Sequence, residues 1–194
     1  AGKRKPMHPR WVAYQLGKIL EPDAILLDDA ISNSGFVCDH HGRAQDMVIE
    51  MAFDEDARIL ALRETGYGDM GGYLSQFGPL LPTGNQVKNL ASIYRTPMME
   101  VATKCVFTNT TFVSAYRGAG RPEAAYLIER LVDACARELG LTPDEIRRRN
   151  MIAPEAMPYE TALGESYDSG EFARLMAEGM KLADWAGFPV RRER

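Results

Sequence analysis

The spacing of apolar residues predicts both helices and strands in the first part of the chain. Between residues 9 and 20 the apolar side chains recur at helical spacing, and Pro9 suits the start of a helix. Residues 22–32 contain a short apolar run that is closed by two adjacent aspartates, and a short apolar run of this kind predicts a buried strand. A turn-rich stretch at residues 33–43 then indicates a boundary.

A β-hairpin is predicted after this boundary. Apolar residues occupy alternate positions over residues 47–53, so their side chains share one face of a strand. The acidic residues 54–56 supply the turn, and the apolar run 59–62 returns. Residues 66–85 are rich in glycine and predict an irregular crossing with a short helical piece. Residues 99–117 carry many β-favouring side chains and predict a return to extended structure.

The last third of the chain is predicted to be helical. Pro122 suits a first helical position, and Gly140 suits the end of the same helix. Residues 142–145 form a capping box that starts a second helix, and residues 168–171 have the same spacing before a third. The apolar stripe of the first helix comprises Ala125, Ile128, Leu131, Val132, Cys135 and Leu139. Together these elements predict an α+β fold in which an antiparallel sheet carries a helical layer.

Composition excludes several broad classes of protein. The chain has 194 residues, enough for one sizeable domain or two small ones, and its formal charge of −4 argues against a general nucleic-acid binder. The three cysteines form no CxxC pair, which favours a reducing, cytoplasmic location over a disulfide framework. No run approaches the ~20 apolar residues of a membrane helix, so we expect no membrane partner.

The residue types offer little classical catalytic or metal-binding chemistry. His40 and His41 are adjacent, so on a strand they would point to opposite faces and could not easily chelate one metal ion. No serine–histidine–acid order and no cysteine–histidine pair stands out. The clustered arginines at 147–149 read as a solvated helix end. We therefore assign no catalytic residue and no metal ligand.

The stretch "AYRGAGRPEA" is the strongest candidate binding site. Gly118 and Gly120 let the backbone bend sharply and let a ligand approach its N–H groups, while a helix start directs its positive end at the turn. Arg117 and Arg121 could add bidentate donors to an anionic ligand. The alternative is that the glycines only allow a strand to turn into a closely packed helix. Spacing alone does not decide between the two.

From about residue 35 onward the chain resembles the molybdopterin-binding large subunit of the xanthine dehydrogenase, aldehyde oxidase and carbon monoxide dehydrogenase family. The matching segments are "HGRAQDMVIEMAFDEDARILALR", "GGYLSQFGPLLPT", "VFTNTTFVSAYRGAGRPEAAYLIERLVDACARELGLTPDEIRRRNMI" and "YDSGEFARLMAEGMKLADW", in the family's order. The resemblance implies that residues 35–194 are part of a molybdenum-hydroxylase cofactor-binding domain.

The same resemblance assigns roles to the turn. Arg117, Gly118 and Gly120 would contact the molybdenum side of a molybdopterin, which in this family can be the cytosine dinucleotide form. Ala119 and Tyr116 would face the substrate. Gly118 and Ala119 stand where true copper–molybdenum carbon monoxide dehydrogenase carries a cysteine-containing loop.

Other parts of the family's site are not found in this sequence. These are the glycine-rich GGFGG-type segment that precedes this region and the C-terminal part with the catalytic glutamate. The expectation is therefore a cofactor site that other parts of the large subunit complete, with no activity and no retained cofactor in this chain alone. Full assemblies would add iron–sulfur and flavin partners, and would hydroxylate an aldehyde or a heteroaromatic carbon or act on carbon monoxide.

Two further hypotheses come from the same sequence. Residues 1–34 are similar to the start of the cofactor-binding domain of thiamine diphosphate enzymes, which predicts a helix–strand segment of different origin from residues 35–194. A fragment related to thiamine diphosphate enzymes is therefore the weaker alternative function. The other hypothesis is a non-catalytic module that keeps the fold and covers its exposed apolar surface by self-association, as a homo-oligomer.

Overall fold

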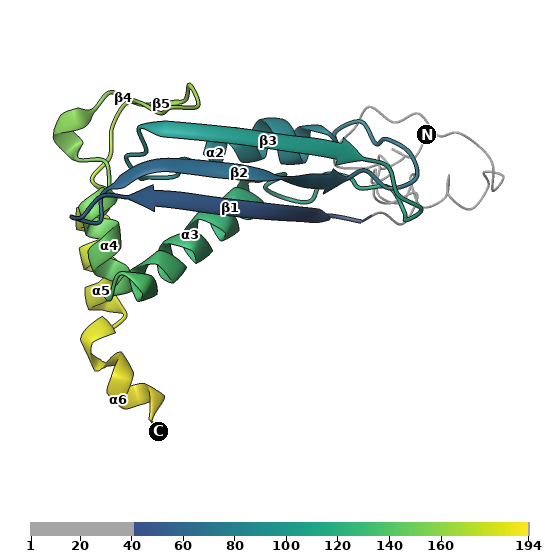
Figure 1. Cartoon of the computed structure of the whole chain (residues 1–194). Helices are drawn as coiled ribbons and strands as arrows, with labels where there is room; N and C mark the ends of the chain where they lie inside the picture. The colour runs from purple at the N-terminus through teal and green to yellow at the C-terminus, as the bar shows by residue number, and fades with distance from the viewer. Residues whose placement is uncertain (1–40, 194) are drawn as a thin grey trace, which may run out of the picture. The chain divides into compact units, whose positions relative to one another are not determined.

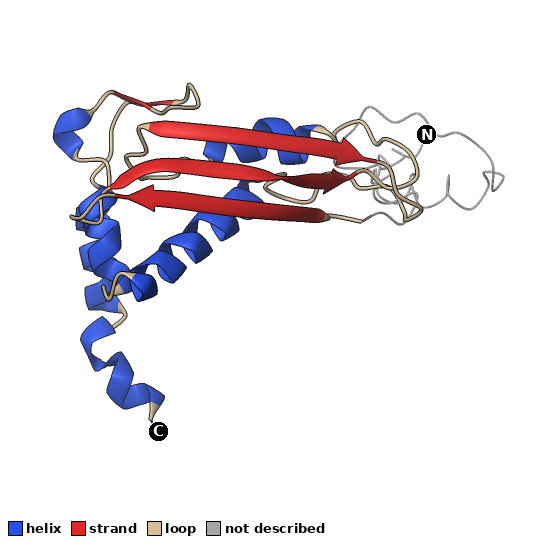
Figure 2. Cartoon of the chain, viewed as in Figure 1, coloured by secondary structure: helices blue, strands red, loops and turns tan. Residues whose placement is uncertain are grey.

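A computed structural model describes residues 41–193, and these residues form an α+β fold (Figures 1 and 2). The expected fold class is confirmed. The elements in chain order are β1 (Gln45–Phe53), β2 (Ile59–Asp69), the π-helical turn η2 (Leu81–Asn85), α2 (Gln86–Asn89), β3 (Met98–Val106), α3 (Arg121–Glu138), α4 (Pro143–Asn150), η3 (Pro154–Ala156), β4 (Tyr159–Glu160), β5 (Ser166–Tyr167), α5 (Phe172–Leu182), η4 (Trp185–Gly187) and α6 (Phe188–Arg192). The predicted helix and strand before residue 33, and the proposed boundary at residues 34–35, lie outside the described residues.

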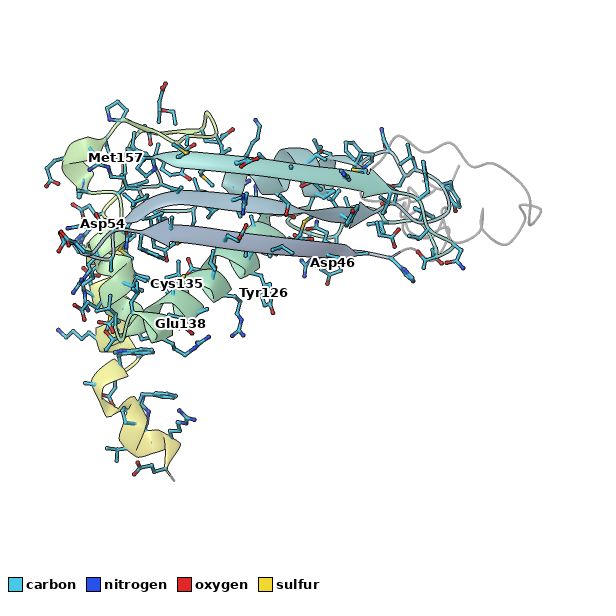
Figure 3. The ribbon with its side chains drawn as sticks, in the orientation of Figure 1. Asp46, Asp54, Tyr126, Cys135, Glu138 and Met157 are labelled. Carbon is cyan, nitrogen blue, oxygen red and sulfur yellow. The ribbon has the colours of Figure 1, made fainter. Side chains whose placement is uncertain are left out.

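The main sheet has three strands in the order β1-β2-β3. β1 and β2 form the predicted antiparallel hairpin, whose turn is fixed by Asp54, labelled in Figure 3. One Asp54 carboxylate oxygen accepts from the Asp56 and Arg58 amides at 3.0 and 2.8 Å. β3 departs from the expected antiparallel arrangement, because it runs in the same direction as β2 (Figure 1) and the Met70 amide donates to the Val106 carbonyl where both strands end. The crossover that contains η2 and α2 makes this parallel pairing possible.

The described residues divide into two compact units. The first comprises residues 41–47, 66–86 and 102–123, and the second comprises residues 48–65, 87–101 and 124–193. Each unit has its own buried residues.

The second unit contains the larger apolar core. α3 packs there on one face of the strands, with small residues, Ala124 and Ala136, and the branched Ile128 and Val132 buried at intervals of four. The apolar stripe predicted from the sequence coincides with this buried line only at Ile128 and Val132, and its outer members Ala125 and Leu139 are exposed. Small side chains let the helix approach the sheet closely, so alanines rather than the larger leucines occupy the central line. The core comprises Ile59, Leu62, Leu90, Tyr94, Ile128, Val132, Ala136 and Ile146.

Asn150, the last residue of α4, connects that helix to the hairpin turn through side-chain hydrogen bonds. Its side-chain oxygen accepts from the Ile59 amide at 2.7 Å, and its nitrogen donates to the Ala57 and Ile146 carbonyls at 2.8 and 2.9 Å. The helix begins as predicted, because the Thr142 hydroxyl accepts from the Glu145 amide at 3.3 Å. The α4 cap is therefore a confirmed sequence prediction.

The later capping prediction is wrong. α5 begins at Phe172 with Glu171 at its N-cap and no side-chain cap, and the Asp168 carboxylate accepts from Ser169 instead. Residues 171–193 contain no buried position, so packing does little to fix this helix start. Within residues 41–193 no helix combines the length and apolar character that a bilayer crossing requires.

Candidate functional site

The stretch between β3 and α3 forms two successive tight turns in the first unit. The Ala119 amide donates to the Tyr116 carbonyl at 2.7 Å, and the Arg121 amide donates to the Gly118 carbonyl at 3.0 Å. Gly118 has φ of +93°, the conformation that the third position of a type II turn requires. Ala119 has φ of +42°, a conformation that costs a residue with a Cβ of the order of 1 kcal/mol. The turn is therefore locally strained at its centre, where the predicted substrate-facing residue lies.

Gly120 brings this turn into close contact with the crossover segment. Its φ is +99°, and a Cβ at this position would lie 2.4 Å from the Leu81 carbonyl oxygen and 2.9 Å from the Gln86 nitrogen. Leu81 and Gln86 are both buried. Only glycine satisfies both the backbone conformation and the space, so the close packing that the sequence suggested is present.

The backbone N–H groups of the turn are mostly engaged inside the protein. The Ala119 and Arg121 amides close the two turns, and the Gly120 amide donates to a Glu123 carboxylate oxygen at 3.0 Å. Glu123 therefore caps the start of α3, an arrangement that resembles half of a capping box. The predicted cradle of free helix N–H groups is wrong for these three amides, because the helix cap and the turns use them first.

The two arginines of the motif remain available to a ligand. Arg117 and Arg121 are exposed, and no acidic side chain of the described residues forms an ion pair with either. Tyr116, beside them, is 59% exposed. The structure therefore leaves the guanidinium groups, rather than the backbone, as the groups that could bind an oxo-anion here.

Arg43 is a residue of this site that the sequence analysis missed. Its guanidinium lies 4.6 Å from the centre of the Tyr116 ring and donates to the Arg117 carbonyl at 3.1 Å. Its Nε lies 3.5 Å from the Glu123 carboxylate. The signal in the sequence was the "HGR" of the first matching segment, but only the fold shows that it reaches the turn.

A second ordered loop lies in the same unit. Asp69, at the end of β2, accepts from the Gly71 amide and the Thr108 hydroxyl, both at 2.7 Å, and from the Thr110 hydroxyl at 3.2 Å. The Gly71 hydrogen bond and the two hydroxyls lower the pKa of Asp69, although partial burial opposes them. This carboxylate holds residues 107–111, which the sequence predicted as strand but which follow the end of β3 as a loop.

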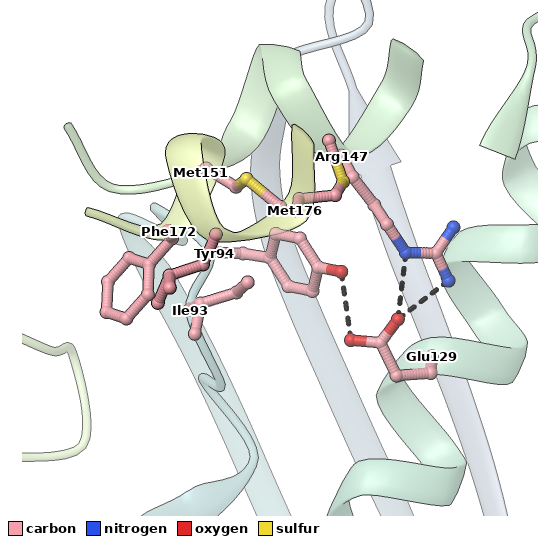
Figure 4. A pocket seen from close by; sticks show the side chains of 8 residues that line it. Ile93, Tyr94, Glu129, Arg147, Met151, Phe172 and Met176 are labelled. Atoms are coloured by element: carbon pink, nitrogen blue, oxygen red, sulfur yellow. Dashed lines mark hydrogen bonds and ion pairs between the residues drawn. The ribbon is translucent and has the colours of Figure 1, made fainter. Parts of the chain in front are cut away.

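A shallow apolar pocket of about 360 Å³ lies in the second unit (Figure 4). Its polar groups bind one another: the Tyr94 hydroxyl donates to Glu129 at 2.9 Å, and Arg147 donates to the same carboxylate at 2.6 and 3.0 Å. Burial, with Glu129 beside it, raises the pKa of Tyr94. Arg147 also pairs with Asp133 at 2.9 Å and is only 17% exposed, so reading it as solvated was wrong. The remaining lining residues are Ile93, Met151, Phe172, Leu175 and Met176.

This network joins α3 and α4 and leaves no polar group in the pocket that is free to act on a ligand. Within residues 41–193, histidine, cysteine and acidic side chains form no group of three or more that could hold a metal ion. The turn at residues 116–121 is therefore the better candidate site.

Comparison with known proteins identifies the family. The molybdopterin cofactor-binding domain family matches residues 32–151. A curated relative, the 6-hydroxypseudooxynicotine dehydrogenase complex subunit gamma of Paenarthrobacter nicotinovorans, is 32% identical over 181 residues, which cover 91% of this chain and 22% of that protein. The carbon monoxide dehydrogenase large chain of Hydrogenophaga pseudoflava is 33% identical over 157 residues, covering 80% of this chain and 19% of that protein.

Solved structures give the same result. Quinoline 2-oxidoreductase from Pseudomonas putida 86 superposes with a TM-score of 0.73 and 31% identity, covering 78% of this chain and 20% of that one. The Cu,Mo-CO dehydrogenase superposes with a TM-score of 0.69 and 28% identity. This chain thus belongs to the molybdopterin-binding large subunits of the xanthine oxidase family. It spans about a fifth of the length of these relatives.

The residues of the turn fit one edge of a molybdenum–pterin group. Such a group presents oxo and phosphate oxygens, which an arginine without an acidic partner suits. The space that a Cβ would take at Gly118 and Gly120 is filled by Pro122 and by the Leu81 carbonyl oxygen, so these glycines shape the turn rather than open room for a ligand. The described residues supply this edge of a site.

Proposed function

We propose that this chain supplies the Arg117 turn to the cofactor site of a molybdenum hydroxylase. In this proposal Arg117, Gly118 and Gly120 contact the molybdenum side of molybdopterin, and Ala119 and Tyr116 face the substrate. The observation that carries the proposal is the exposed guanidinium of Arg117, which forms no ion pair with an acidic side chain of residues 41–193 and lies beside a turn whose glycines have positive φ angles.

The chemistry that the bound cofactor supplies is two-electron oxidation of a carbon centre with oxygen taken from water. The residues of this chain have simpler tasks. Arg117 would bind and orient an oxygen-rich edge of the cofactor, and Gly118 and Gly120 would hold the turn that presents it. Tyr116 and Ala119 would shape one wall of the substrate space. The proposed substrate is an aldehyde, a heteroaromatic compound or carbon monoxide.

We further propose that the site is completed by other polypeptide. The chain spans about a fifth of the length of its relatives, and the rest of a large subunit would supply the remaining residues of the site. The relatives include subunits of larger complexes, so iron–sulfur and flavin partners belong to the proposal as well. The cytosine dinucleotide form of the cofactor and a cytoplasmic location remain predictions from the sequence.

Metal and pterin analysis tests this proposal. The purified chain, produced in a host that makes molybdopterin, is expected to contain far less than one molybdenum per chain. Inserting the same residues in place of the matched stretch of the Paenarthrobacter gamma subunit is expected to restore molybdenum and pterin together. Stoichiometric molybdenum in the isolated chain would contradict the view that the site is incomplete.

A second candidate function is the self-associating module. It is favoured by the apolar side chains left exposed on the C-terminal helices, such as Leu182 at 90% and Val190 at 61% exposure. A non-catalytic assembly of copies would cover this surface without a cofactor. The completed subunit is the Paenarthrobacter gamma subunit in which these residues replace the matched stretch. Its molybdenum content distinguishes the two functions, because a non-catalytic module requires no molybdenum.

A further inference from the structure

The segment of residues 41–43 runs beside the candidate turn, although 74 residues separate Arg43 from Arg117. The His41 amide donates to the Phe112 carbonyl at 3.0 Å, and the Ser114 amide donates to the His41 carbonyl at 2.9 Å, which together form a short parallel bridge. A Cβ on Gly42 would lie 3.2 Å from the Tyr116 Cβ, so the two segments are in close contact. This pairing delivers the next side chain, Arg43, to the turn.

The Arg43 guanidinium then contacts the turn at three points. It lies over the Tyr116 ring at 4.6 Å, it donates to the Arg117 carbonyl at 3.1 Å, and it pairs with Glu123 at 3.5 Å. Arginine can make these contacts together because its planar group stacks through one face and donates through its edge. Arg43 itself has φ of +57°, an uncommon conformation for a residue with a side chain.

The contact with Glu123 links Arg43 to the other end of the turn. The Glu123 side chain is only 9% exposed, and one of its oxygens accepts from the Gly120 amide at 3.0 Å. The other oxygen has no hydrogen-bond partner in the described residues, and the Arg43 guanidinium lies beside it at 3.5 Å. A nearly buried carboxylate needs such a counter-charge.

We propose that Arg43 is the positioning residue of the cofactor turn. It fixes the Tyr116 ring and the Arg117 carbonyl directly, and it fixes the Gly120 amide through Glu123. The Arg117 guanidinium and Ala119 are thereby presented to the cofactor edge, a consequence that rests on the proposed function. The Arg43 side chain is 41% exposed and its recorded contacts are all with the turn and its cap, so it acts on the turn rather than on the apolar core.

Amide hydrogen exchange measured by NMR on the whole chain tests this proposal. In Arg43→Ala, the Ala119 and Gly120 amides are expected to exchange at least about tenfold faster than in the wild type, because a charge-assisted contact to each end of the turn is lost. The Ile59 and Leu62 amides of the second unit are the internal reference and are expected to keep their rates. Arg130→Ala, an exposed arginine of α3, is the matched control and should change neither pair.

Arg43→Lys keeps the test decisive if the alanine variant folds poorly. Lysine retains the charge beside Glu123 but lacks the planar group, so Gly120 protection should largely return while Ala119 stays accelerated. Unchanged exchange at both amides in these variants would overturn the positioning role, whatever the chain binds. Faster exchange, combined with normal molybdenum content when Arg117 is replaced in the completed subunit, would support the positioning role and overturn the proposed function instead.

Discussion

At the scale of single residues, Asp69 shows how one carboxylate can organise a loop beside the candidate site. It binds one amide and two hydroxyls from residues 71, 108 and 110. Hydrogen bonds to a carboxylate stabilise its charged form, which is why the pKa of Asp69 is lowered. The ionised side chain therefore stabilises the loop alongside backbone hydrogen bonds, such as that from the Thr108 amide to the Gly71 carbonyl at 3.0 Å.

This dependence predicts how the stability of the chain responds to acid. A carboxyl group whose pKa is lowered by folding contributes stability above its unfolded value of 3.8, and the contribution is lost as pH falls through the folded value. Asp69→Asn should therefore lower the free energy of unfolding by about 1 kcal/mol or less at pH 7, since the group is partly exposed. The gap between wild type and variant should shrink as pH falls below about 4.

Urea unfolding at neutral and acidic pH measures this gap. Asp46→Asn, at an exposed position, is the control and should show little change at either pH. A gap for Asp69→Asn that stays constant from pH 7 to about 3 would mean that the carboxylate charge does not hold the loop.

At the scale of elements, Gly120 connects the candidate turn to the crossover segment. Gly120→Ala would place a methyl group 2.4 Å from the Leu81 carbonyl oxygen in a backbone with φ of +99°. We expect it to lower the free energy of unfolding by about 2–4 kcal/mol, combining the conformational cost with the steric overlap.

Gly140→Ala is the matched control for this prediction. Gly140 follows α3 with φ of +66°, and a Cβ there would meet nothing within 4 Å. It should therefore cost only the conformational strain, about 1 kcal/mol. Chemical denaturation measures the free energy of unfolding of both variants. An equal decrease in the two would show that the turn is not packed on the crossover.

Local signals made the hairpin and the helices predictable. The alternation of residues 47–53, the Thr142 cap and the Gly140 helix end each depend on neighbours within a few residues, and all three are present. The position of α5 was predicted to within a few residues but its cap was not, because the Asp168 carboxylate accepts from the Ser169 hydroxyl and does not cap the helix. The parallel direction of β3 was not visible in the sequence, since pairing across a long crossover leaves no local mark.

The candidate site was predictable only in part. The positive φ of Gly118 and Gly120 follows from the residue type. The capture of the Gly120 amide by Glu123 competes with the expected ligand contacts, and a helix with a glutamate in its first turn could have suggested it. Arg43 could not have been found by spacing, because its contacts depend on pairing between distant segments.

At the scale of the whole molecule, the C-terminal helices carry several exposed apolar side chains. None of residues 171–193 is buried, and Leu175, Leu182 and Val190 are 59%, 90% and 61% exposed. Such side chains gain free energy when another surface covers them, at roughly 25 cal/mol per Å². We expect the isolated chain to self-associate through this surface.

Light scattering coupled to size exclusion measures that association. Replacing Leu182 and Val190 together by glutamine should shift the apparent mass toward that of a monomer. Replacing Lys181 and Arg192 by glutamine in the same helices is the control and should leave the assembly intact. A wild-type chain that remains monomeric at high concentration would contradict the expectation.

The central claim, that the Arg117 turn contacts the cofactor, is tested most directly by molybdenum content in the completed subunit. The stretch of the Paenarthrobacter gamma subunit that matches this chain is replaced by this chain, and molybdenum per subunit is measured for Arg117→Ala and for the exposed control Arg130→Ala. Loss of one charge-assisted contact should lower cofactor affinity about tenfold or more, so Arg117→Ala should lose most of its molybdenum while Arg130→Ala retains it. Full molybdenum content in Arg117→Ala would contradict the assignment of the site.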